Sequence, residues 1–111
     1  MNAKETIENL TNSVEGLSKK LPEQMDNFQN FAESVISDGA LSTKMKLIIA
    51  VSVAITKRCE YCIVMNLKKA IDAGVTKEEL LEACSVVMLL DGGPAMAYTT
   101  FLEEKYDELT S

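Results

Sequence analysis

Apolar residues recur along much of this chain at alternating spacings of three and four, the period of an amphipathic α-helix. The first such stripe consists of Ile7, Leu10, Val14, Leu17 and Leu21. A second stripe consists of Met25, Phe28, Phe31 or Ala32, and Val35. Pro22 suits the first position of the second helix, and Asp38-Gly39 suits its end, because glycine accepts the left-handed backbone of a C-terminal cap. These residues predict two helices, each with one packing face.

The most apolar segment, Leu47 to Ile55, lies in a third predicted helix that runs from about Thr43 to Lys57 and is capped by Ser42. It is apolar on almost every side, so we expect a central, buried element. The same nine residues could also form a buried strand. A strand followed by Cys-x-x-Cys is typical of a thioredoxin-like fold. That fold needs several strands, and only Val86 to Leu90 offers another, so we favour the helix.

Three further helices complete an all-α prediction. In chain order they are expected from near Cys59 to Ala73-Gly74, from Thr76 to Leu90, and from Pro94 to about Tyr106. Thr76 and Glu79 have the spacing of a capping box, and residues 91–94 (Asp-Gly-Gly-Pro) form a sharp break. The charged run Glu103-Glu104-Lys105 is expected on a solvated face. The predicted fold is a compact bundle of about six helices, a single domain over residues 1–111.

Composition narrows the class of protein. With 111 residues, 47% of them hydrophobic, the chain can bury one core but not two. Its 17 acidic and 11 basic residues give a net charge of -6. This argues against nucleic acid or an anionic membrane as a partner, because both require a basic face. The N-terminus lacks the apolar region of a signal peptide, and no apolar stretch reaches the roughly 20 residues that span a bilayer. We therefore expect a cytoplasmic protein.

The chain contains no histidine, which excludes Ser-His-Asp and Cys-His nucleophile systems and histidine zinc motifs. Three cysteines remain, and Cys59 and Cys62 form a Cys-x-x-Cys at an expected helix start. In a reducing compartment such a pair is redox-active or metal-binding more often than structural. A structural zinc site needs four ligands, and only Cys84 is left as a soft ligand, so we predict no metal and no cofactor. Cys84 lies among apolar residues and is interpreted as part of the core.

Two cysteines three residues apart at the start of a helix share a face and can close a disulfide. Unpaired N–H groups of the first turn stabilise a thiolate there. Lys57 and Arg58 add positive charge, whereas Glu60 opposes them. The pair is therefore predicted to cycle between dithiol and disulfide. The alternative is that both cysteines are small buried hydrophobic residues.

Three segments in this order carry a family resemblance: Cys59-Glu-Tyr-Cys-Ile63, Ala70-Ile-Asp-Ala-Gly-Val-Thr-Lys-Glu-Glu79 and Gly92-Gly-Pro-Ala95. Over residues 41–95 the chain resembles the alkylhydroperoxidase D / carboxymuconolactone decarboxylase family. The resemblance implies an all-helical homo-oligomer, a trimer or hexamer. The lactone decarboxylases generally lack the cysteine pair, so the pair favours the antioxidant thiol peroxidases, which are peroxiredoxin-type oxidoreductases. By this resemblance Cys62 would attack a peroxide and become a sulfenic acid. Cys59 would then condense with it to a disulfide, which an external dithiol reduces.

Two positions depart from the redox members of that family. They carry a histidine where this chain has Asn66, and a glutamate where it has Leu47. Asn66, one turn from Cys62, can hydrogen-bond the sulfur but cannot accept its proton, and Leu47 cannot relay one. General base assistance is worth about 100- to 10,000-fold, so we predict slow or absent peroxide turnover. Glu60 and Tyr61 are possible supporting residues, although helical geometry turns them away from the sulfur face.

Three functions therefore stay open. The first is a thiol–disulfide redox enzyme that uses a peroxide or a disulfide as oxidant and a dithiol as reductant. The second is a carboxymuconolactone decarboxylase-like enzyme, against which the cysteine pair argues. The third is a non-catalytic oligomeric binding protein that lost the proton relay. The missing histidine and glutamate favour the third function, and the retained pair favours the first.

Overall fold

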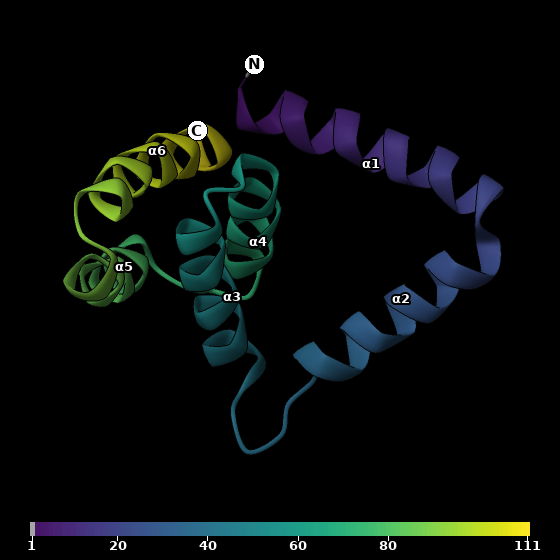
Figure 1. Cartoon of the computed structure of the whole chain (residues 1–111), viewed down its shortest axis with the longest axis horizontal. Helices are drawn as coiled ribbons and strands as arrows, with labels where there is room; N and C mark the ends of the chain where they lie inside the picture. The colour runs from purple at the N-terminus through teal and green to yellow at the C-terminus, as the bar shows by residue number, and fades with distance from the viewer. Residues whose placement is uncertain (1) are drawn as a thin grey trace.

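The computed structural model describes residues 2–111, which form six α-helices and contain no strand (Figure 1). They are α1 (Ala3–Lys20), α2 (Pro22–Ile36), α3 (Thr43–Lys57), α4 (Glu60–Asp72), α5 (Lys77–Asp91) and α6 (Gly93–Thr110). The all-α prediction is confirmed and the thioredoxin-like alternative is wrong. The sixth helix continues past the predicted end at Tyr106. None of the helices in this range has the length and apolar character needed to cross a membrane.

Local capping explains most helix starts. Ser42 Oγ accepts the Met45 N–H of α3 at 3.1 Å. In the capping box of α5, Thr76 Oγ1 accepts the Glu79 N–H at 3.1 Å, and Glu79 Oε1 accepts the Thr76 N–H at 2.9 Å. These bonds satisfy donors that a helix start leaves unpaired, so the sequence signals and the structure agree.

The core is formed mainly by α3, α4, α5 and α6. Its fully buried members include Ile55, Ile63, Leu67, Leu80 and Leu102. The expectation of a central, buried α3 holds for one face of the helix only. Leu47 and Val51 lie in the core, whereas Ile49 and Val53 on its other face remain 45% and 48% exposed. One face of α3 packs within the chain, and the other stays uncovered.

The first two helices form an arm that leaves the bundle, as Figure 1 shows. α1 starts beside α6, where the Ala3 N–H donates to Glu108 Oε1 at 2.6 Å, and α2 turns back toward the start of α3. Ala3 is the one residue of α1 that is buried, and α2 has none among its residues. Phe28 and Phe31 of α2 are 56% and 66% exposed. The apolar stripe of α2 therefore lacks a full packing partner among residues 2–111.

Lys105 corrects the prediction of a solvated run in α6. Glu104 is exposed, but Lys105 keeps only 8% of its surface accessible. Its ammonium lies 3.2 Å from Glu108 Oε1 and 5.3 Å from the centre of the Phe101 ring. Lys105 follows Leu102 by three residues and so falls on the buried stripe of the helix, with its charge paired.

Candidate functional site

A tight turn between α3 and α4 presents the cysteine pair. Arg58 ends α3 in the left-handed conformation, with φ 53°, and its N–H donates to the Ile55 carbonyl at 3.2 Å. A non-glycine residue in this conformation costs about 1–2 kcal/mol, which the surrounding packing must offset. The turn places Cys59 at the N-cap of α4 and starts the helix at Glu60.

Cys59 and Cys62 form a disulfide, with their Cα atoms 5.2 Å apart. The Cys62 N–H donates to the Cys59 sulfur at 3.2 Å, so this sulfur takes the place of the usual N-cap oxygen. Cys62 is exposed and Cys59 is half-buried, so the interpretation of both as buried hydrophobic residues does not hold. The pair is accessible, and its first sulfur is held by a backbone donor of the helix start.

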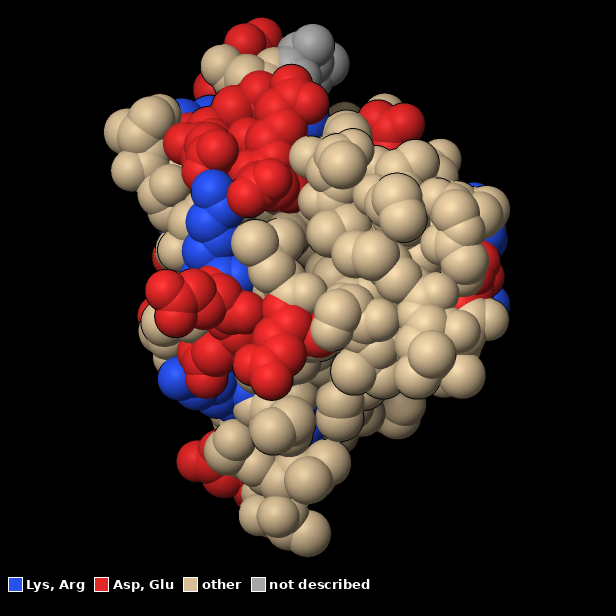
Figure 2. Space-filling view, turned by 90° about the vertical axis from the view of Figure 1, so that its left-hand side faces the viewer, with Lys and Arg blue, Asp and Glu red and all other residues tan. Residues whose placement is uncertain are grey.

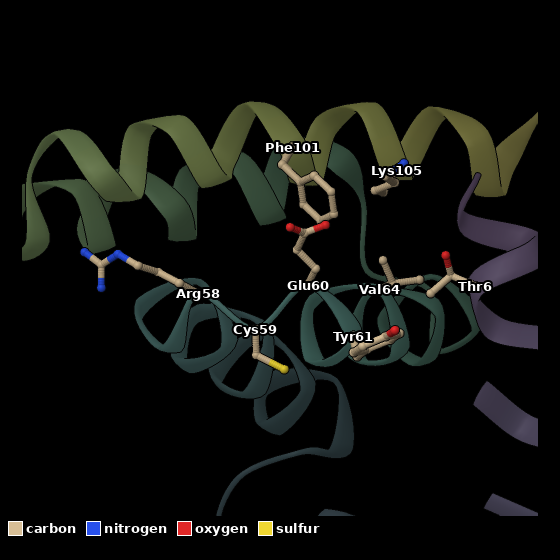
Figure 3. Close-up of a pocket in the computed structure, with 8 residues that line it drawn as sticks. All are labelled: Thr6, Arg58, Cys59, Glu60, Tyr61, Val64, Phe101 and Lys105. Carbon is tan, nitrogen blue, oxygen red and sulfur yellow. The ribbon is translucent and has the colours of Figure 1, made fainter. Parts of the chain in front are cut away.

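The Arg58 guanidinium next to the cysteine pair forms an ion pair with another helix. Arg58 Nη2 lies 3.0 Å from Asp91 Oδ2 at the end of α5, and its Nη1 donates to the Thr56 carbonyl at 2.9 Å. Figure 3 shows the Arg58 side chain extending away from Cys59. The Arg58 charge therefore stabilises a thiolate of the cysteine pair less than its adjacent position in the sequence indicates.

The two positions that depart from the family pattern have other partners. Asn66 Nδ2 donates to the Cys62 carbonyl at 2.8 Å, a bond along its own helix rather than to a sulfur. Leu47 is 3% exposed and belongs to the hydrophobic core. Neither side chain can take a proton from the cysteine pair.

A pocket of about 490 Å³ adjoins the pair (Figure 3). Its lining consists of Thr6, Arg58, Cys59, Glu60, Tyr61, Val64, Phe101 and Lys105. In Figure 3 Glu60 extends toward Phe101, whereas the Cys59 sulfur points the opposite way. Tyr61 is 62% exposed and borders α1. Glu60 and Tyr61 therefore both line the pocket, and Glu60 extends away from the Cys59 sulfur.

Thr6, Phe101 and Lys105 are pocket residues that sequence reasoning missed. They come from α1 and α6, far from the cysteines along the chain. The helical period places Lys105 on the same buried stripe as Leu102, and this spacing is the sequence signal that could have identified Lys105. No local pattern links either helix to the turn at Cys59.

Cys84 lies apart from this site, fully buried in α5. Burial raises the pKa of its thiol, and a hydrogen bond with the Thr99 side chain opposes part of that rise. The interpretation of Cys84 as a core residue is confirmed.

Comparison with known proteins connects this geometry to a family. The family model described as the carboxymuconolactone decarboxylase family matches residues 22–103. The crystal structure of a protein of that family from Legionella pneumophila, in its apo form, superposes with a TM-score of 0.94 at 29% identity, covering 98% of this chain and 97% of that one. A structure from Methanobacterium thermoautotrophicum gives 0.62 at 36% identity, over 78% and 97%. A Paracoccus denitrificans protein named protein 4 in cox locus is 34% identical over 76% of each chain.

Proposed function

This chain belongs to the carboxymuconolactone decarboxylase family, and on that premise we propose that it is a thiol–disulfide redox protein working through Cys59 and Cys62. The observation that carries the proposal is the accessible Cys59–Cys62 disulfide at the first turn of α4. A helix start stabilises thiolates, and two sulfurs on one turn exchange with a partner at little conformational cost.

The proposed peroxide reaction has three balanced steps. The Cys62 thiol attacks a hydroperoxide, whose O–O bond breaks, and the products are a sulfenic acid and an alcohol or water. The Cys59 thiol then displaces water from that sulfenic acid and forms the disulfide. A dithiol reductant attacks the disulfide and leaves oxidised, restoring both thiols.

The surroundings of the pair support exchange more than peroxide turnover. Asn66 is engaged with the Cys62 carbonyl and Leu47 is in the core, so neither position supplies a general base for the first step. Thiol–disulfide exchange needs only a thiolate, which the helix start stabilises. We therefore expect a reversible disulfide, with a protein or small-molecule disulfide as the faster oxidant.

The test measures consumption of hydrogen peroxide and of a disulfide substrate with dithiothreitol as reductant. Wild type is expected to cycle its disulfide, shown by mass spectrometry, with slow peroxide turnover that Cys62→Ser abolishes. Asn66→His is expected to raise the rate of peroxide consumption, because it supplies a general base, an effect worth roughly 100- to 10,000-fold. The increase should lie in the lower part of this range, because position 47 stays apolar and cannot relay the proton. Asn66→Gln is the matched control and should leave the rate unchanged.

A second candidate is a non-catalytic, homo-oligomeric binding protein, favoured by the loss of both relay side chains at Asn66 and Leu47. If neither Cys59 nor Cys62 cycles with any dithiol or disulfide, this candidate replaces the first. Turnover of a carboxymuconolactone with both cysteines replaced would instead establish the decarboxylase-like alternative. In each case we propose a homo-oligomer, a trimer or hexamer, as the family resemblance implies.

A further inference from the structure

An ion pair joins the turn that carries Cys59 to the end of a different helix. Arg58 Nη2 lies 3.0 Å from Asp91 Oδ2, and the two residues are 33 positions apart along the chain. Arg58 ends α3, and Asp91 is the last residue of α5, directly before Gly92. The contact therefore connects the turn before α4 with the turn before α6.

The place of Asp91 is unfavourable for α5 itself. The last carbonyls of a helix carry partial negative charge, so a carboxylate at this end opposes the helix dipole. Among the ion pairs of residues 2–111, the partner of Asp91 is Arg58. What the carboxylate gains at this position is therefore its contact with the guanidinium, and not a contribution to its own helix.

Two acceptors hold the Arg58 side chain. One is Asp91, and the other is the Thr56 carbonyl, which accepts from Arg58 Nη1 at 2.9 Å. Arg58 directly precedes Cys59, the N-cap of α4, yet Figure 3 shows its side chain extending away from that residue. The guanidinium is thus the cation next to the cysteine in sequence, and the ion pair draws it off.

The charged or titratable groups around the cysteine pair come from four helices. They are Lys57 and Arg58 at the end of α3, Glu60 and Tyr61 at the start of α4, Asp91 at the end of α5, and Lys105 in α6. The pocket residue from α1, Thr6, is uncharged. Lys105 pairs with Glu108 inside α6. Arg58 is the cation of this set that an ion pair ties to another helix.

We propose that Asp91 is a positioning residue that tunes the redox pair: by holding Arg58 away from Cys59, it makes the disulfide a weaker oxidant. The proposal rests on the proposed thiol–disulfide function and names a residue that adjusts it. A nearby cation stabilises a thiolate, and a stabilised reduced form makes a disulfide more oxidising. When a dithiol reduces the pair, its two electrons break the Cys59–Cys62 bond and the reductant closes its own disulfide. Drawing the cation off therefore favours the disulfide side of this exchange.

The alternative is an ordinary surface ion pair. Figure 2, which views the side on which α5 and α6 lie, shows acidic side chains in patches with basic side chains between them. Between these helices Lys77 lies 3.3 Å from Glu103 and 3.0 Å from Asp107. Exposed pairs of this kind contribute little to stability. The effect of Asp91 should therefore be sought in the chemistry of the sulfurs.

The first test follows the labelling of Cys59 by iodoacetamide against pH in the Cys62→Ser protein, with and without Asp91→Ala. An opposite charge at about 4 Å favours an ion about fivefold in water and more at a protein surface, so the freed guanidinium should favour the thiolate about tenfold. Half-maximal labelling should then occur at a pH about 1 lower. Alanine suits the end of a helix, so circular dichroism should be unchanged.

The second test measures the reduction potential of the proteins with both cysteines, in a dithiothreitol redox buffer approached from both sides. At pH 9, where thiolate forms, Asp91→Ala should favour the reduced form about tenfold, which raises the potential by about 30 mV. At pH 5, where both sulfurs are protonated, the two proteins should agree. A loosened turn without an electrostatic effect would shift the potential equally at both pH values.

Two further variants and one control isolate the ion pair. Asp91→Glu keeps the carboxylate and should restore wild-type behaviour in both tests. In an Arg58→Gln background, Asp91→Ala should change the thiolate equilibrium by less than about twofold, because no guanidinium is released. Asp72→Ala is the matched control: Asp72 is also the last residue of its helix and pairs with Lys68 at 2.8 Å. It lies roughly 20 Å along α4 from the cysteines, beyond the range of screened charges, and should change neither readout.

Each other outcome overturns the proposal. An unchanged pH profile and potential in Asp91→Ala would show that the ion pair has no influence on the sulfurs. An effect that persists in the Arg58→Gln background would show that it does not act through Arg58. If the disulfide fails to cycle in every protein, wild type included, the proposed function fails and this inference with it. Normal cycling without an effect of Asp91→Ala overturns this inference alone.

Discussion

At the scale of single residues, the N-cap position distinguishes Cys59 from Cys62. The Cys62 N–H donates to the Cys59 sulfur at 3.2 Å, and a donor stabilises the charged form of a sulfur more than the neutral one. Family resemblance assigns the attack on peroxide to Cys62, whereas this contact favours Cys59 as the thiolate in the reduced protein. Which sulfur attacks first depends on whether a base or a helix start activates it.

We expect Cys59 in the Cys62→Ser variant to react with iodoacetamide about tenfold faster at neutral pH than Cys62 in the Cys59→Ser variant. A hydrogen bond to a charged group is worth about 1.5–3 kcal/mol, of which the weaker sulfur acceptor realises the lower part. Mass spectrometry of timed samples gives both rates. Faster labelling of Cys62 would show that the N-cap contact does not activate Cys59.

Cys84 is expected to be inert in the folded protein. Its thiol is buried, and burial raises its pKa, so little thiolate forms and reagent cannot reach it. In a Cys59→Ser/Cys62→Ser variant, iodoacetamide should leave the native chain unlabelled and add one label after denaturation. Rapid labelling under native conditions would show that α5 opens locally.

At the scale of elements, short-range bonds explain where helices begin. The capping box of α5 pairs two donors at Thr76 and Glu79, and Glu79 also lies 3.2 Å from the Lys44 ammonium on α3. The box therefore sets the start of α5 and also ties it to a neighbouring helix.

Thr76→Ala is expected to lower the free energy of unfolding by about 1 kcal/mol, because it removes the side-chain acceptor of the box. Urea denaturation followed by circular dichroism measures the loss. Thr100→Ala, at an exposed position within α6, is the control and should change stability by less than about 0.5 kcal/mol. Equal losses for both substitutions would argue against a capping contribution.

At the scale of the whole molecule, the two ends of the chain are joined. The Ala3 N–H donates to Glu108 Oε1, and Glu108 also pairs with the buried Lys105. The bond from Ala3 lowers the pKa of the Glu108 carboxyl below its ordinary value of 4.5, with Lys105 adding to the effect. This contact holds the base of the arm against α6.

A lowered carboxyl pKa means that folding favours the ionised form of Glu108. The stabilisation is therefore complete above pH 4.5 and is lost as the pH falls through the lowered value. Glu108→Ala should reduce the urea midpoint at pH 7, and its difference from wild type should shrink as the pH is lowered toward 3. The exposed control Glu104→Ala should show no such trend. A difference that stays constant with pH would exclude an electrostatic origin.

Much of the fold follows from local chemistry. The helical periods, the capping residues Ser42 and Thr76, and the break at residues 91–94 placed all six helices in the correct order. The cysteine pair at the start of α4 was predicted for the same reason, since spacing and helix geometry involve only neighbouring residues. These features depend on hydrogen bonds within about one helical turn.

Burial could not be predicted in the same way. The period of α2 and the apolar run of α3 indicate faces that need cover, but whether a face finds cover depends on helices far along the chain. Phe31 and Ile49 remain exposed, whereas Lys105 is buried with its charge paired. The sequence pattern of an apolar stripe is the same whether the stripe packs against other helices of its chain or stays exposed.

The sequence by itself determined the all-helical class, the order of the six helices and the place of the Cys59–Cys62 pair at the start of α4. Only the tertiary structure showed that Thr6, Phe101 and Lys105 line one pocket with Cys59, and that α2 and α5 lie on opposite sides of α3 and α4. The physical reason is the distance along the chain over which the interactions act. Helices and caps arise from bonds between near neighbours, while pockets and uncovered faces arise from how whole helices pack.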